Sequence, residues 1–90
     1  MMYQYYTVEI SKNKDGEFEH SVLWHYAETD EEARLKGEAK FHEILSRAAV
    51  SDFAEHAAIL FSSRGKRIMD KCYIHATTPE ESEVIDDAEH

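Results

Sequence analysis

Two stretches near the start of the chain alternate apolar with polar side chains and are rich in β-forming residues. They cover residues 3–10 and 17–26. Alternation with a period of two predicts strands that each have one apolar face. The segment Lys14-Asp15-Gly16 lies between them and is typical of a turn. The pattern therefore predicts a β-hairpin.

The length of the hairpin loop decides which side chains share a face. A two-residue turn at Asp15-Gly16 would pair Val8 with Leu23, whereas a three-residue loop pairs Val8 with Val22. A one-residue change of register moves every side chain to the other face. We prefer the three-residue loop, because it gives Gly16 the positive φ and gathers the apolar residues on one face. That face holds Tyr6, Val8, Ile10, Phe18, Val22, Trp24 and Tyr26, and the opposite face holds Thr7, Glu9, Ser11, Glu17, Glu19, Ser21 and His25.

The clearest helix signal begins at Thr29, where Thr29-Asp30-Glu31-Glu32 matches a capping box. An apolar stripe with helical spacing follows, and the helix is predicted to end near residues 50–52. Gly37 lies within this stripe, which suggests a close approach of the helix to the sheet, since glycine costs about 1 kcal/mol relative to alanine in a helix. The stripe consists of Ala33, Gly37, Phe41, Ile44, Leu45 and Ala48.

A second pair of strands is predicted over residues 56–61 and 66–75, joined by a turn at 62–65. The fold class is therefore α+β, with the order β-β-α-β-β and one helix packed on one face of a four-stranded sheet. The long crossover between the hairpins allows the sheet to be wholly antiparallel, and the strand order stays open. We place Ala57, Ile59, Phe61, Ile68, Cys72 and Ile74 on the inward face.

The formal net charge of −9 is unevenly distributed along the 90 residues. Residues 77–90 contain six of the 19 acidic residues and no Lys or Arg, so we expect a disordered acidic tail after a single domain at 1–76. The domain itself is only mildly acidic. It lacks the basic surface that nonspecific nucleic-acid binding needs, and no run of about 18 apolar residues predicts a membrane span.

Candidate chemistry is sparse. The chain has six histidines, but they lack the spacing of metal ligands, and the single cysteine allows neither a disulfide nor a zinc finger. Cys72 lies within a predicted strand and is interpreted as a buried, inert thiol, which suits a reducing cytoplasm. No nucleophile–base pair and no phosphate-binding loop is recognisable. We expect no enzyme activity, no cofactor and no metal.

The outer face of the predicted sheet is the candidate interaction site. It can simply face water, or it can bind a second copy of the chain or another protein. Its apolar members are Tyr3, Tyr5, Leu23, Leu60, Met69 and Tyr73, with His25, Arg67 and Lys71 at the edge.

The order of features resembles a family of small proteins of unknown function from phages and prophages of anaerobic bacteria. The similarity covers residues 5–75: a tyrosine-rich strand, a glycine turn, the helix start from Thr29 to Ala33, the Phe41-His42 step, and a second glycine turn before an acidic tail. It implies a phage-linked accessory role in a bacterial host cell or on the virion, and supplies no catalytic or binding residues.

Three functions are therefore weighed. The first is a non-enzymatic interaction module. The second is an acidic mimic of nucleic acid that inhibits a host defence protein. The third is a small enzyme or ligand-binding domain.

Overall fold

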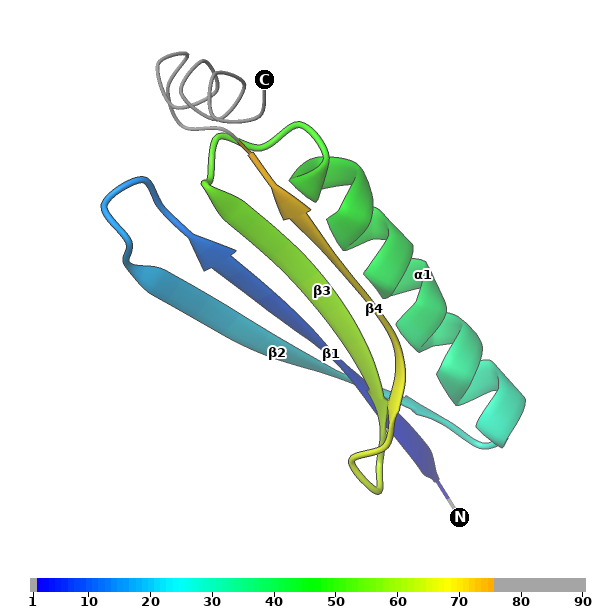
Figure 1. Cartoon of the computed structure of the whole chain (residues 1–90). Coiled ribbons are helices and arrows are strands. Elements are labelled where there is room, and N and C mark those ends of the chain that lie inside the picture. Colours follow the sequence, from blue (N-terminus) through cyan, green and yellow to red (C-terminus); the bar gives the residue numbers. More distant parts are fainter. Residues whose placement is uncertain (1, 76–90) are drawn as a thin grey trace, which may run out of the picture.

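A computed structural model describes residues 2–75 and consists of one antiparallel sheet and one helix (Figure 1). The elements are β1 (Tyr3–Lys12), β2 (Phe18–Ala27), α1 (Asp30–Ala48), β3 (Glu55–Ser62) and β4 (Arg67–Ile74). The strands lie in the order β2-β1-β3-β4. The predicted α+β class and the β-β-α-β-β order are confirmed. The tail expected at 77–90 lies outside the described residues.

The first hairpin has the predicted register, with Val8 opposite Val22. Its loop is closed by two backbone hydrogen bonds: Asn13 N–H donates to the Glu17 carbonyl at 2.9 Å, and Gly16 N–H donates to the Asn13 carbonyl at 3.0 Å. Gly16 has a φ of 89°, the left-handed conformation for which glycine is suited. The three-residue loop is thus confirmed.

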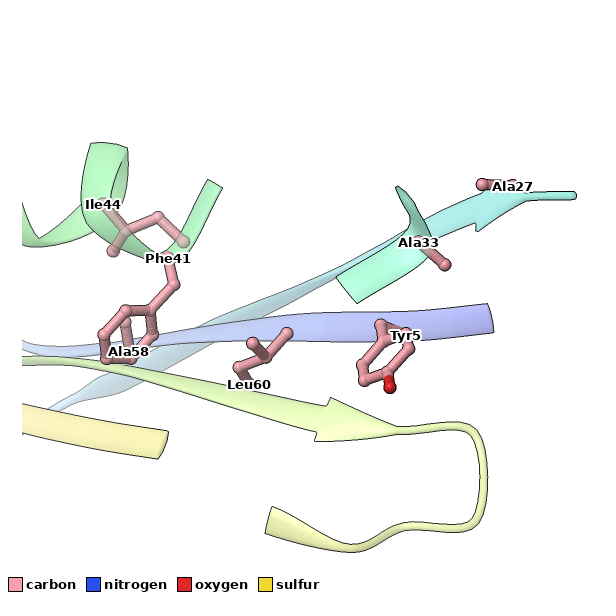
Figure 2. Packing of buried hydrophobic residues seen from close by; sticks show 7 residues of the cluster. All are labelled: Tyr5, Ala27, Ala33, Phe41, Ile44, Ala58 and Leu60. Carbon is pink, nitrogen blue, oxygen red and sulfur yellow. The ribbon is translucent and has the colours of Figure 1, made fainter. Parts of the chain in front are cut away.

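The helix begins and packs as its sequence predicts. The Thr29 side chain accepts a hydrogen bond from the Glu32 backbone N–H at 3.1 Å, which satisfies one of the free amides of the first turn. The buried helix residues Ala33, Gly37, Phe41, Ile44 and Ala48 form one stripe toward the sheet. In Figure 2, Phe41 extends from the helix toward β3 at Ala58.

The face of the sheet that the helix covers is opposite to the one predicted. Tyr5 and Thr7 of β1 and Leu60 of β3 are buried beneath α1, while Val22 and Trp24 remain exposed. The side chains expected inward on all four strands therefore lie on the uncovered face of the sheet, called here the open face. The covered face also buries Ser11, His25, Ala27, His56 and Ala58.

The handedness of the chain explains this reversal. Both β2 and β3 are antiparallel to β1 and therefore parallel to each other, so β2-α1-β3 is a crossover of the kind that is right-handed in about 98% of cases. The backbone groups of Asn13 form hydrogen bonds toward β2, and the carbonyl of Lys12 forms one toward β3. Odd-numbered residues of β1 therefore bond toward β2 and even-numbered residues toward β3. For L-residues with this bonding pattern, the odd-numbered side chains lie on the face that a right-handed crossover covers. Handedness, and not apolar content, selects the covered face.

Several polar side chains on the covered face and at the helix ends form hydrogen bonds. The Thr7 hydroxyl and His25 Nε2 lie 2.7 Å apart and bond to each other. At the start of the helix, the Tyr5 hydroxyl donates to Asp30 Oδ1 at 2.9 Å. At the other end, His75 Nε2 lies 2.9 Å from the Ala48 carbonyl and donates to it. These bonds lower the cost of burying polar groups and tie both ends of the helix to the sheet.

Candidate functional site

The open face is the main exposed feature of the described residues, and it carries most of the large apolar side chains of the sheet. Residues paired across neighbouring strands have their side chains on the same face of the sheet. One such row consists of Val22 of β2, Val8 of β1 and Ile59 of β3. Trp24 retains 44% of its accessible surface and Ile74 retains 77%. Exposed or half-buried members of this face are Tyr6, Val8, Ile10, Phe18, Val22, Trp24, Tyr26, Ile59, Phe61, Ile68 and Ile74.

An aromatic row crosses three strands of the open face. The Tyr6 ring of β1 lies 4.6 Å from the Trp24 ring of β2 and is stacked 4.9 Å from the Phe61 ring of β3. Tyr26 extends the row, with its ring 6.5 Å from that of Trp24. Such pairs contribute about 0.5–1.5 kcal/mol beyond their area and hold the rings in fixed orientations. The row is therefore an ordered ridge of aromatic surface.

Two ion pairs, each within one chain, border the open face. Lys12 Nζ lies 3.2 Å from Glu55 Oε2 on the neighbouring strands β1 and β3. Arg67 Nε lies 3.2 Å from Asp70 Oδ2 within β4. The two charges of each pair cancel, so these four side chains add no net charge to the open face.

The residues proposed from the sequence as an outer interaction site lie on the covered face. Tyr5, His25 and Leu60 are buried there, and they cannot contact a partner. Met69 and Tyr73 are half-buried, and only Tyr3 and Leu23 remain exposed among the apolar members. The exposure expected of Tyr5, His25 and Leu60 is therefore wrong, because the helix covers the face on which they lie. The prediction that Cys72 is buried is also wrong, because its side chain is exposed on the open face.

A second candidate is the polar cluster of Glu9, Arg47 and His56 at the C-terminal end of the helix. His56 Nε2 donates to Glu9 Oε2 at 2.6 Å, and the Arg47 guanidinium donates to both Glu9 oxygens at 3.2 and 3.4 Å. Burial alone would raise the pKa of Glu9, but the hydrogen bonds and charges of His56 and Arg47 hold the pKa of this carboxyl below its usual 4.5. Glu9 is thus an ionised anchor for the helix end.

This cluster is not arranged for acid–base catalysis. It borders a hollow of about 230 Å³ that Ser11 and Phe53 also line. A catalytic histidine needs one ring nitrogen free to reach a substrate. In His56, Nε2 is hydrogen-bonded to Glu9. Nδ1 has no hydrogen-bond partner, but it is buried and therefore cannot reach a substrate. Among residues 2–75, no group of three or more His, Cys, Asp or Glu side chains is placed to hold a metal ion.

Comparison with known proteins returned no matching family model, no matching curated protein and no matching solved structure. Within the described part of the chain, no helix is both long and apolar enough to cross a membrane. The function therefore has to be inferred from the geometry of the chain itself, and above all from the open face.

The signal that could have located the open face was present in the sequence. Alternation and register gathered its residues into one set correctly, including Tyr6, Val22, Trp24 and Ile59. What was missing was the side of the sheet on which the helix packs.

Proposed function

We propose that the protein is a non-enzymatic protein-binding module and that the open face is its binding surface. One observation carries the proposal: the sheet leaves its more apolar face uncovered. A sheet with a single covering layer normally directs its polar side chains to water. Here the helix covers Thr7, Ser11 and His25, while Trp24, Tyr6 and Phe61 stay on the uncovered side.

The extent of this surface supports the proposal. Monomers rarely expose contiguous apolar patches beyond a few hundred Å², and larger ones usually mark interaction sites. Aromatic residues are also enriched at the centres of protein interfaces, where rigid rings bury much area at little entropic cost. An accessory role of this kind agrees with the resemblance to small phage and prophage proteins.

The test compares two neighbouring residues of β2 that point to opposite faces. Val22 lies on the open face and Leu23 on the covered face, and they are 46% and 47% exposed. The wild type and the Val22→Glu and Leu23→Glu variants are each used to capture proteins from the source cells, including untagged copies of the chain. We expect association that survives Leu23→Glu and is lost with Val22→Glu. Equal retention by both variants would contradict the proposal.

A further inference from the structure

We infer that the open face binds a second copy of this chain, so that two sheets pack face to face with the helices outside. This inference rests on the proposed function, because it names the partner of the same surface. Three properties of the open face favour a copy of itself over an unrelated partner: its size, its charge and its relief.

The size of the open face is of the order of a standard dimer interface. Four strands spaced about 4.8 Å apart, each about eight residues long at about 3.3 Å per residue, give a face of roughly 500 Å² in plan. Protruding rings and aliphatic chains make the accessible area larger than the plan area. The face thus approaches the ~800 Å² per partner of a standard interface, without a contribution from the helix.

The charge does not select for a foreign partner. An isologous two-fold contact brings a surface against itself, so a patch with a net charge meets a like charge. The pairs Lys12–Glu55 and Arg67–Asp70 remove that repulsion, because each is closed within one chain. A partner of opposite charge would gain little from these two pairs, and in a dimer the pairs themselves cause no repulsion between the copies.

The relief of the face is complementary to itself. The ridge formed by Trp24, Tyr6 and Phe61 lies toward one end of the strands. Four residues before Phe61 in β3, Ala57 belongs to a cross-strand row whose side chains are smaller than those of the ridge; the row consists of His20, Ile10, Ala57 and Cys72. A two-fold axis across the strands sets the ridge of one copy over this row of smaller side chains in the other. The inner faces then interdigitate at about 10 Å, as in aligned β-sandwiches.

The sequence supplies two native reporters for this contact. Trp24 is the only tryptophan and Cys72 the only cysteine, and both lie on the open face. Sedimentation of the purified full-length chain from about 1 to 500 µM measures its mass, tryptophan emission reports the environment of Trp24, and the rate of maleimide alkylation reports access to Cys72. In the dimer we expect a doubled mass, blue-shifted emission and slower alkylation, with the same concentration midpoint.

The matched variants locate the interface. Because the two-fold axis places two new carboxylates in one apolar contact, Val22→Glu is expected to weaken dimerisation at least about 100-fold. Leu23→Glu is expected to change it less than about threefold. If Val22→Glu does not fold, as judged by circular dichroism, the reporters in the wild type decide alone. A dimer whose Trp24 emission and Cys72 alkylation match those of the dilute monomer would use another surface, such as the strand edges, and would overturn the inference.

The outcomes also separate this inference from the proposed function. A wild-type chain that stays monomeric throughout, yet captures another protein in a Val22→Glu-sensitive manner, overturns self-association and leaves the binding module intact. A monomer that captures nothing through this face overturns both.

Discussion

Gly37 of α1 lies so close to Leu60 of β3 that a Cβ on Gly37 would be 2.6 Å from Leu60 Cδ1. Real Cβ atoms do not approach a carbon this closely, so the helix can reach the sheet here only because this residue has no side chain. Tyr5 Cβ and His25 Cδ2 are the next atoms, at 3.5 and 3.6 Å. Side chains from three strands, β1, β2 and β3, therefore surround Gly37 and leave little room for an added methyl group.

Replacing Gly37 with alanine is expected to destabilise the fold by about 1 kcal/mol. Alanine gains about 1 kcal/mol in helix propensity, but overpacking against the fully buried Leu60 costs about 1–3 kcal/mol. Urea unfolding should show the lower stability. The double variant with Leu60→Val should recover part of the loss, because the smaller side chain makes room. Stabilisation by Gly37→Ala alone would show that Leu60 moves freely.

The stability of the domain is expected to fall on acidification below about pH 6.5 because of His25. Burial, and secondarily the charges of Lys40 and Lys36, lower the pKa of His25 from its usual 6.5 in the folded chain. The unfolded chain therefore binds a proton first as the pH falls. The stabilisation is complete above pH 6.5 and is lost as the pH decreases toward the folded-state pKa.

Urea midpoints measured between pH 7.5 and 5.5 test the role of His25. The wild type should lose stability over this interval, and a His25→Gln variant should show a flatter profile because residue 25 no longer titrates. If the variant loses the hydrogen bond to Thr7, it is expected to be less stable than the wild type at neutral pH. The diagnostic quantity is therefore the slope of the urea midpoint against pH, and not the midpoint at one pH. Identical slopes would assign the titration to another group.

Tyr5 and Tyr6 are expected to respond differently to removal of the hydroxyl group. The Tyr5 hydroxyl donates to Asp30 Oδ1, and burial together with that bond raises the pKa of Tyr5 above 10.0. Tyr5→Phe should cost about 1–2 kcal/mol, since a hydrogen bond to a charged group is lost. Tyr6→Phe keeps the stacked ring on the open face and should change stability by less than about 0.5 kcal/mol. Thermal unfolding measures the stability lost in each variant. Equal losses in Tyr5→Phe and Tyr6→Phe would contradict the prediction.

The sequence was sufficient to predict the elements, the hairpin register and the helix stripe, because all of these depend on local chemistry. The helix start at Thr29, the turn at Gly16 and the stripe through Phe41 each have a specific physical reason and are confirmed. Of the predicted capping box, the structure shows the bond from the Glu32 N–H to the Thr29 hydroxyl. The prediction of the covered face is wrong because apolar content alone does not determine the side on which the helix packs. The decisive information was the strand order, which sets the handedness of the crossover.

One sequence feature did hint at the correct face. A helix stripe built on Ala33, Gly37 and Ala48 brings the backbone close to the sheet, so the strand residues beneath it cannot form a thick aromatic layer. Ala58 and Thr7 fit beneath such a helix, whereas the Trp24 ridge does not. The covered face carries polar side chains, but Thr7 and His25 satisfy each other by a hydrogen bond across the first hairpin. Such a pair becomes visible only when the two strands are placed side by side.

The central position of β1 also has a consequence for how the chain folds. Val8 pairs with Val22, which follows 14 residues later, and with Ile59, which follows 51 residues later. The first contact closes a short loop and the second a long one, so the hairpin and the helix can form before β3 arrives. Until then one side of β1 has unpaired backbone groups. The docking of β3 is therefore expected to set the folding rate, and substitutions at Ile59 should slow folding more than those in β4.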